Sequence, residues 1–325
     1  LGMAYLYMDD LDNAEKNLKE AYKIFNKLFY DSINSHETNQ IYENLALLNL
    51  NKGLYDETYK FINKLIDNSI ILVKEQSQYF PEIYRKNFST FYLRNYDTLF
   101  SLISIFPEAK TLALKARINR QGILEDIEKY QSRILQLGNK EKELFDNLKS
   151  IESKLSNYSI VGDKRKNLII QKIQIEESLY EKIPNLEANV FEINDVKKVL
   201  PSNSVLIEFQ KYQPIDLKRV LNKNSDRIKT LERYGALILN SSGEINFVDL
   251  GLAKIIEKDI ENALYSTKQY LDDADDLWKK LGNLIFNPII DVIGDSDTLF
   301  ISPDSELNRV PFAALGVNNS NRYLG

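Results

Sequence analysis

The chain has 325 residues, which predicts about two domains because single cores seldom exceed roughly 250–300 residues. It contains no cysteine, which excludes disulfides, thiolate metal sites and a thiol nucleophile and fits a reducing, cytoplasmic compartment. Its 42 basic and 47 acidic residues are interleaved and give a net charge of −5, so we expect no nucleic-acid partner. No segment reaches the roughly 20 apolar residues of a membrane span, so no membrane association is expected.

The amino-terminal region repeats its residue pattern with a period of 44. Residues 1–18 align with residues 45–62. Gly2 and Ala14 are small where two antiparallel helices must approach each other, and Leu18 fills the groove between neighbouring repeats. The pattern therefore predicts two successive helix pairs.

This spacing resembles the tetratricopeptide repeat, in which Leu-Gly-x-x-Tyr is followed by alanine and, four residues later, by a large apolar residue. The matching residues of the first copy are Leu1, Gly2, Tyr5, Ala14 and Leu18. The second copy is degenerate, with Asn49 and Thr58 at the tyrosine and alanine positions. The resemblance implies a TPR-like α-solenoid with capping helices over residues 1–106 that binds a protein or peptide partner.

The only histidine, His36, lies in the segment that makes this repeat longer than the usual ~34 residues. No second histidine or cysteine accompanies it, so we expect a packing or capping role rather than a general base or metal ligand. Aromatic and aliphatic residues stay dense from Ile71 to Phe106 and predict one or two further helices. Their stripe indicates a helical core rather than a cofactor site.

Apolar residues from Ile123 to Leu155 advance by steps of four, three or seven, with one charged position in the series. This heptad seam predicts one helix of about 35 residues, or about 50 Å. A break follows at residues 161–163, and apolar positions then resume until Pro184. We expect a long antiparallel coiled-coil hairpin within residues 107–190, as a spacer, a partner-docking arm or a bare stalk.

After this hairpin the periodicity changes. Buried strands are predicted at residues 204–209 and 234–239, and a turn rich in Asn, Ser and Gly leads to a third strand at residues 244–250. Residues 252–264 and 277–292 then follow helical spacing. The pattern predicts a hairpin on a sheet with flanking helices.

The aspartates within residues 272–276 resemble a calcium loop only superficially, because the glycine and terminal glutamate of an EF-hand are missing. They predict a helix start, where carboxylates favour the positive end of the helix dipole. Trp278 follows on that helix and is expected to pack on the sheet rather than to contact a partner.

A fourth strand, at residues 297–302, runs into the sharp turn Pro303-Asp304. Leu307 and Phe312 then anchor a short helix. We expect this strand to be a core strand of the α/β sheet.

With what precedes them, residues 303–315 resemble the signature of the CHAT family, whose caspase-like domains occur beside tetratricopeptide repeats. Residues 119–122, which open the predicted long helix, and residues 199–201 and 322–324 occur in that family's order too. The resemblance implies a multidomain fold of α followed by α/β. Residues 191–325 would form the first part of a caspase-like α/β sheet domain.

In the CHAT family the activity is that of a cysteine peptidase, in which a histidine acts as the base for a cysteine thiolate. The resemblance puts both residues downstream of Leu324, and neither has a counterpart here. We therefore assign no catalytic, cofactor-binding or metal-binding residue and expect no cofactor. A start at Leu1 rather than Met, and an end at Gly325 without a closing element, lead us to expect a fragment.

Three hypotheses follow. The first is the amino-terminal part of a CHAT-type cysteine peptidase whose repeats bind a partner or substrate. The second is an interaction or signalling scaffold with an inactive caspase-like domain, and the third is an α-solenoid with an unrelated α/β cap. Serine-based hydrolysis is set aside, because Ser242, Ser302 and Ser305 lack a G-x-S-x-G elbow and a histidine in their domain.

Overall fold

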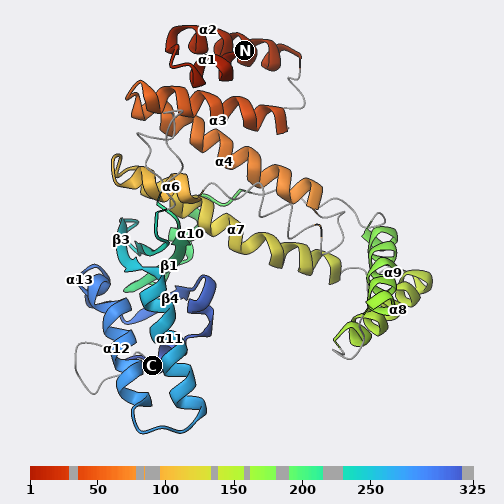
Figure 1. Cartoon of the computed structure of the whole chain (residues 1–325), viewed down its shortest axis with the longest axis vertical. Coiled ribbons are helices and arrows are strands. Elements are labelled where there is room, and N and C mark those ends of the chain that lie inside the picture. The colour runs from red at the N-terminus through yellow and green to blue at the C-terminus, as the bar shows by residue number, and fades with distance from the viewer. Residues whose placement is uncertain are drawn as a thin grey trace.

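The computed structural model of the chain describes residues 1–28, 36–77, 84, 96–132, 138–156, 162–180, 190–214 and 230–316. Over these residues the protein is mostly helical and has one small four-stranded sheet (Figure 1). Helices come first and the sheet with its flanking helices follows, which confirms the predicted order of α and then α/β. Within the described part, no helix combines the length and the apolar character needed to cross a membrane.

The first four helices form two pairs whose turns repeat along the chain. The bounds are α1 Gly2–Tyr7, α2 Leu11–Leu28, α3 His36–Asn51 and α4 Tyr55–Ser77. Asp9 and Gly53, 44 positions apart, both adopt left-handed backbone conformations, with φ of 59° and 69°. The end of α1 and the end of α3 are closed by corresponding backbone hydrogen bonds, Asp10 N–H to Tyr5 O and Leu54 N–H to Asn49 O. The predicted period of 44 therefore recurs in the turn geometry itself.

Small residues hold the paired helices close together, as predicted. A Cβ atom placed on Gly2 would lie only 2.7 Å from the side chain of Leu18, so a larger residue there would force Leu18 to shift. Ala14 is fully buried in the cluster that joins the first pair to α3. Thr58, which replaces this alanine in the second copy, is buried and donates its hydroxyl to Leu54 O at 3.0 Å. The degenerate position is thus polar but satisfied.

Two further helices, α6 Tyr96–Ile103 and α7 Ala109–Ser132, pack against each other, and α7 also packs against α4. Helix α6 confirms the prediction of one or two further helices between Ile71 and Phe106. Most of the aromatic residues on which it depended lie outside the described residues: Phe80, Phe88, Phe91 and Tyr92.

The predicted single helix from Ile123 to Leu155 is wrong. Helix α7 ends at Ser132, and α8 begins only at Asn139 and runs to Leu155. Gly138 precedes α8 in an extended conformation, with ψ of 178°. Glycine is a poor helix residue, and the heptad steps continue across it, so periodicity alone joined two helices into one.

Helix α9, Gly162–Tyr180, packs on α8, and the two form a helix pair that stands apart from the sheet (Figure 1). Its start at Gly162, where φ is 64°, confirms the predicted break at residues 161–163. The predicted end near Pro184 lies outside the described residues, as do the seam side chains of residues 121–137.

The sheet has the order β3-β2-β1-β4, with β1 antiparallel to β2, β2 antiparallel to β3, and β1 parallel to β4. The bounds are β1 Ser204–Tyr212, β2 Arg233–Asn240, β3 Ile245–Leu252 and β4 Thr298–Ser302. The three predicted strands and their hairpin are confirmed. The fourth was predicted to be a core strand, but it is one of the two edge strands of the described sheet, and Phe300 is 42% exposed. A short apolar run does not distinguish an edge from a centre.

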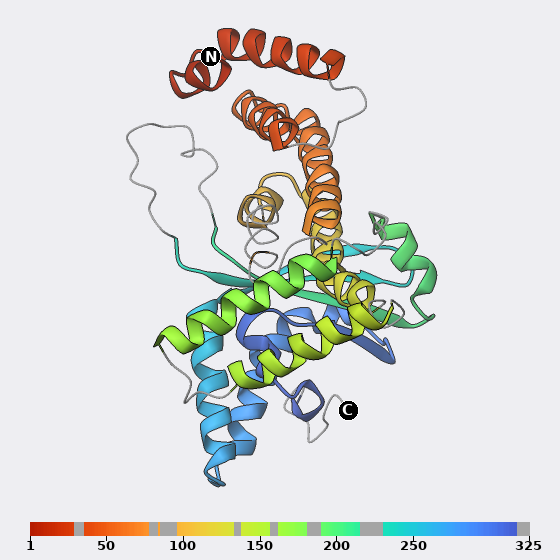
Figure 2. The same ribbon diagram turned by 90° about the vertical axis from the view of Figure 1, so that its right-hand side faces the viewer.

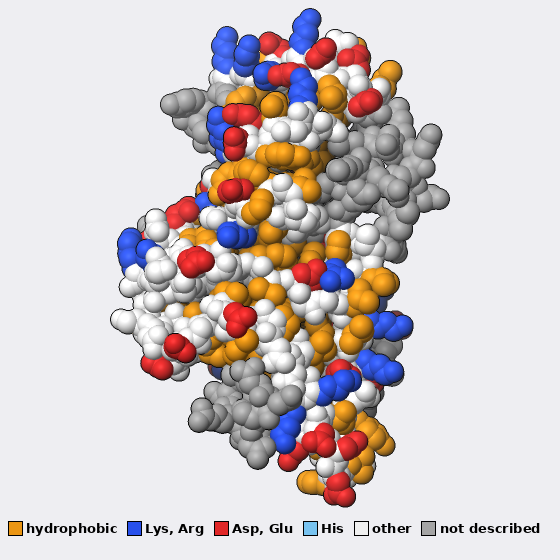
Figure 3. All heavy atoms as spheres, turned by 90° about the vertical axis from the view of Figure 1, so that its left-hand side faces the viewer, with side chains coloured by type: hydrophobic (Ala, Val, Ile, Leu, Met, Phe, Trp, Pro, Cys, Tyr) orange, Lys and Arg blue, Asp and Glu red, His pale blue; other side chains and the backbone are white. Residues whose placement is uncertain are grey.

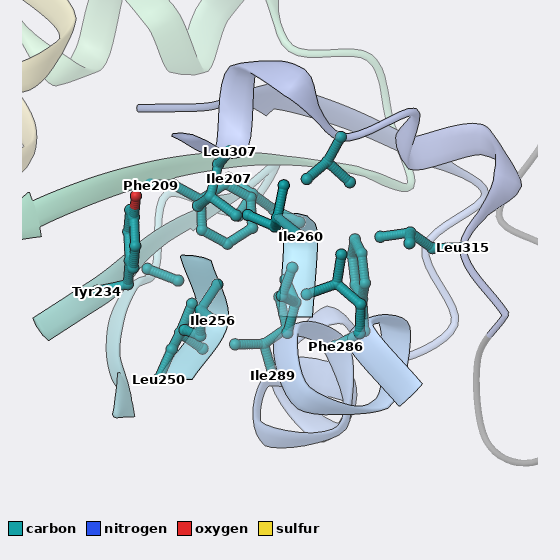
Figure 4. Close-up of a cluster of buried hydrophobic side chains, with 14 of the residues drawn as sticks. Ile207, Phe209, Tyr234, Leu250, Ile256, Ile260, Phe286, Ile289, Leu307 and Leu315 are labelled. Carbon is teal, nitrogen blue, oxygen red and sulfur yellow. The ribbon is translucent and has the colours of Figure 1, made fainter. Parts of the chain in front are cut away.

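Helices cover both faces of the sheet, which Figure 2 shows nearly edge-on between α6 above and α11 below. Alternate residues of β1 and β2, among them Ile207, Phe209 and Tyr234, pack against α11 and α12 (Figure 4). The other alternate residues, among them Tyr212 and Leu237, face α6 and α7. Both faces are thus buried. The bounds of the remaining helices are α10 Ile193–Val199, α11 Ala253–Lys268, α12 Ala274–Phe286 and α13 Ile290–Ile293.

The predictions around α12 and after β4 are largely confirmed. Helix α12 begins at Ala274, directly after Asp273, and Trp278 is buried on it. Leu307 is fully buried, and the Phe312 ring stacks on Phe209 with the centroids 5.8 Å apart. The predicted short helix is instead two 3₁₀ turns, Ser305–Arg309 and Phe312–Ala314.

Candidate functional site

Among the side chains of helix α7 that the structure describes, three buried polar ones attach the helix to other elements. Lys115 and Asn119 are four residues apart and share one face, whereas Arg117 lies on the opposite face. All three are buried. Buried polar groups need hydrogen-bond partners within the protein, so these positions show what α7 must contact.

Arg117 faces the sheet, where the alternation of β1 brings polar side chains to meet it. Glu208 and Gln210 alternate with residues that face α11, so both lie on the α7 side. The Arg117 Nε atom donates to Glu208 Oε2 at 3.1 Å, and Nη1 donates to Gln210 Oε1 at 3.3 Å. Arg117 is 1% exposed, and its charge is therefore neutralised inside the protein.

The same guanidinium holds the turn that follows β4. Arg117 Nη2 donates to the Pro303 carbonyl oxygen at 2.9 Å, and Nη1 lies 3.7 Å from Asp304 Oδ1. Asp304 Oδ2 accepts the Lys211 backbone N–H at 2.9 Å and the Gln210 Nε2–H at 2.8 Å. We call this set the arginine cluster: Arg117, Glu208, Gln210, Pro303 and Asp304.

The arginine cluster keeps charged groups away from water at defined positions. Burial raises the pKa of the Glu208 carboxyl, while the Arg117 charge and a hydrogen bond from Ser302 oppose that rise. A guanidinium remains protonated throughout the physiological range, so Glu208 always faces a counter-charge. The Ser302 hydroxyl is also bonded to Glu208, so Glu208 is held by two polar partners.

On its other face, α7 is attached to α4 and to the segment before α10. Lys115 Nζ lies 2.7 Å from Asp67 Oδ1 and 2.7 Å from Glu192 Oε1. Burial would lower the pKa of Lys115, but the hydrogen bonds that it donates to these two carboxylates raise that pKa above its ordinary value. The lysine is therefore held in its charged form and links three elements.

The side chain of Asn119 forms one donated and one accepted hydrogen bond with the main chain just before α10, as the backbone of a neighbouring strand would. Its Nδ2 donates to the Phe191 carbonyl oxygen, and its Oδ1 accepts the Phe191 N–H, each at 2.8 Å. Residues 119–122 were expected to open the long helix, but α7 begins at Ala109 and Asn119 lies well inside it. The role of Asn119 is therefore to join α7 to the entry of the α/β region.

An apolar pocket lies between α3, α4 and α6. Figure 3 shows apolar side chains along this side of the molecule, between the first helices and the sheet. The pocket is lined mainly by aliphatic side chains: Ala46, Leu47, Leu50, Ile62, Leu65 and Leu99. Glu43, Thr58 and Thr98 complete it. Its chemistry suits an apolar side chain of a protein or peptide partner.

The residues that were considered as catalytic or metal-binding candidates from the sequence and then rejected do not form a common site in the structure. His36 begins α3, where its ring Nε2 lies 3.1 Å from Gln40 Nε2. Ser242 lies in the turn between β2 and β3 and bonds to Asn240 Oδ1 at 2.6 Å. Across the described ranges, no group of three or more His, Cys, Asp or Glu residues could hold a metal ion.

The arginine cluster was missed by sequence reasoning, although signals for it exist. Glu208 and Gln210 are polar positions on alternate residues of an otherwise apolar strand, and Arg117 interrupts an apolar helical stretch. Each signal is local and does not say which partner it meets. The chain matches no family model, no curated protein and no solved structure.

Proposed function

We propose that this chain is the amino-terminal part of a CHAT-family cysteine peptidase, in which a TPR-like α-solenoid binds a protein partner or substrate. The observation that carries the proposal is the arginine cluster. The Pro303-Asp304 turn belongs to the segment with the most specific resemblance to that family, and it is the point where Arg117 fastens the helical part to the sheet. Such an arrangement suits a protein whose binding part and α/β part act as one body.

Each region has a defined task under this proposal. The repeated turns at Asp9 and Gly53 support a solenoid built from 44-residue units, and the pocket between α3, α4 and α6 offers a place for a partner's apolar side chain. Helices α8 and α9 would be the coiled-coil arm. The turn after β4 leaves the carboxyl end of a parallel strand, where open α/β sheets place their active sites.

The proposal assigns no chemistry to the residues of this chain. A cysteine peptidase needs a thiolate and a base, but the chain has no cysteine, and its single histidine lies on α3. The nucleophile and base would therefore lie outside these 325 residues. We expect the 325-residue chain alone to cleave no peptide.

The test compares the 325-residue chain with the complete product of its gene. Both are assayed against a quenched-fluorescent peptide library, with and without iodoacetamide, which alkylates thiols. We expect the complete product to cleave peptides, with loss of activity after alkylation, and the chain to be inactive. Cleavage by the purified chain that persists through contamination controls would contradict the proposal.

The second hypothesis is a non-catalytic interaction scaffold with an inactive caspase-like domain. The hydrogen bonds and ion pairs that join Arg117, Gln210 and Asp304 to one another and Arg117 to Glu208 favour it, because a fixed framework suffices for binding. A complete gene product that stays inactive in the same assay, while still capturing a partner through the helical repeats, would support this hypothesis over the peptidase.

A further inference from the structure

The turn that joins α11 to α12 exposes three large side chains at the end of the molecule opposite α1 and α2 (Figure 1). Tyr270 is 93% exposed, Tyr265 is 63% exposed and Leu271 is 47% exposed. We call Tyr265, Tyr270 and Leu271 the tyrosine tip. Apolar and acidic side chains mix at the lower end of the molecule in Figure 3, where this hairpin lies.

The backbone of the tip holds Tyr270 in a conformation that tyrosine rarely adopts. Its φ is 55°, in the left-handed region. The N–H of Tyr270 bonds to Thr267 O and that of Leu271 to Ser266 O, a Schellman closure of α11. The same closure ends α1 and α3, where the left-handed residue is Asp9 or Gly53.

Glycine is the usual residue at this left-handed position because a Cβ atom is strained there, and asparagine or aspartate is the next most tolerated. A tyrosine therefore needs a compensating benefit. Packing does not provide one, since the ring of Tyr270 is almost wholly exposed. Strained residues that persist without a structural gain point to function.

The helices below the tip hold it rigidly. Trp278 Nε1 donates to Thr267 Oγ1 at 2.8 Å, and the Ser266 hydroxyl donates to Asp273. Lys280 Nζ, two residues further along α12, lies 2.8 Å from Asp259 on α11. A surface presented on a packed helical hairpin loses little conformational freedom when a partner binds, which favours affinity.

The charges around the tip are mostly negative. The four aspartates of the turn are all exposed: Asp272, Asp273, Asp275 and Asp276. Lys268 is the one basic residue between Tyr265 and Asp276. An apolar centre with an acidic rim is complementary to an apolar side chain flanked by basic ones.

We propose that the tyrosine tip is a docking surface for a protein segment that carries an apolar side chain between lysines or arginines. Tyrosine is enriched at the centres of protein interfaces, and surrounding charges steer and select the partner. The acidic rim would repel a second copy of the tip and the anionic headgroups of a membrane. The inference does not depend on the peptidase proposal.

The test uses the whole 325-residue chain and two fluorescein-labelled peptides, one alternating leucine with lysine and the other alternating leucine with glutamate. Fluorescence anisotropy measures binding at physiological ionic strength. We expect the lysine peptide to bind and the glutamate peptide to fail. Tyr270→Gly should weaken binding of the lysine peptide at least tenfold while raising the midpoint of thermal unfolding, because it relieves the left-handed strain without changing charge.

Two further variants complete the test. Replacing the rim with Asp275→Asn and Asp276→Asn together should weaken binding and reduce its dependence on salt. Ile255→Ser, which changes an exposed residue at the other end of α11, is the matched control and should bind as the unmodified chain does.

The proposal fails if Tyr270→Gly binds the lysine peptide as tightly as the unmodified chain, or if both peptides bind equally. It also fails if sedimentation shows dimers of the chain that Tyr270→Gly abolishes. Binding of the chain to vesicles of anionic lipid that Tyr270→Gly abolishes would contradict it as well, since either result identifies another occupant of the tip.

Discussion

The two faces of the sheet are both buried, but they are built from different chemistry. The face under α11 and α12 is apolar along most of β1, with Val205, Ile207 and Phe209 in the core, and only Lys211 at the end of the strand pairs with Glu257 of α11. The opposite face combines apolar contacts with the arginine cluster. Apolar contact is non-directional, whereas the Arg117 guanidinium requires its partners at fixed positions. The comparison indicates that one face supplies bulk stability and the other fixes where α7 sits.

The largest expected effect is on the polar face. Arg117→Met should lower the free energy of unfolding by about 3–5 kcal/mol, because it leaves Glu208 buried without its counter-charge. Urea denaturation measures the loss. Adding Glu208→Gln to this variant should restore part of the stability, since the orphaned charge disappears.

Arg309→Met is the matched control for this arginine. Arg309 pairs with Glu306 at 2.6 Å, but both side chains are exposed, so the loss should be below about 1 kcal/mol. Equal losses of unfolding free energy for Arg117→Met and Arg309→Met would show that the buried arginine contributes no more than an exposed one, and the distinction between the two faces would fall.

The apolar face should respond to volume rather than to charge. Ile260, fully buried on α11, contributes to the core in Figure 4, and Ile260→Ala should lower the free energy of unfolding by about 3 kcal/mol through lost burial and the cavity left behind. Thermal and urea unfolding measure it. Ile255→Ala, at an exposed position on the same helix, should change stability little, and a comparable loss there would contradict the assignment.

A smaller effect is expected where α7 meets the segment before α10. Asn119→Ala removes both hydrogen bonds to the Phe191 main chain and should lower the free energy of unfolding by roughly 1–3 kcal/mol. Hydrogen exchange at α10 should rise with it. Asn262→Ala, on the exposed side of α11, is the control, and its α10 exchange should stay unchanged.

The smallest effect is a pH dependence at the edge of the polar face. Burial raises the pKa of Asp97 above its ordinary value of 3.8, while the Gln213 N–H opposes the rise. The folded state therefore binds this proton more tightly than the unfolded chain, so the contribution of Asp97 to stability is greatest below pH 3.8 and is lost as pH rises through the folded value. Asp97→Asn should make the free energy of unfolding depend less on pH, as measured by urea denaturation from pH 3 to 7.

Asp10→Asn is the opposite control. Hydrogen bonds from Asn13 lower the pKa of Asp10, so its contribution is present above pH 3.8 and is lost as pH falls. The two variants should change the slope of stability against pH in opposite directions. Slopes that change in the same direction would show that the Asp97 environment does not act as described.

The features that could be predicted from the sequence are those set by neighbouring residues. The repeat was visible because small residues such as Gly2 and Ala14 are a local requirement of close helix packing, and the first three strands were visible in runs of β-branched and aromatic residues. The interruption at Gly138 was also local, but the heptad spacing of apolar residues continues across it, so the spacing did not reveal the break. The edge position of β4 depends on which strands pair, and the local sequence of a strand does not indicate its neighbours in the sheet.

The arginine cluster lies beyond local prediction for the same reason. Arg117 and Glu208 are 91 positions apart, and Arg117 and Pro303 are 186 positions apart. A polar residue in an apolar stretch shows that a partner must exist, because burial without one is costly. Only the packing of α7 across β1 identifies that partner.

The recurring turns at Asp9 and Gly53 make the helical part modular in length. One unit of 44 residues begins and ends at equivalent helix boundaries, and in repeat arrays each unit contacts mainly its neighbours. Duplicating a unit would lengthen the array by one helix pair and leave the Arg117 junction in place. The length of the helical part and its attachment to the sheet can thus vary independently in evolution or by design.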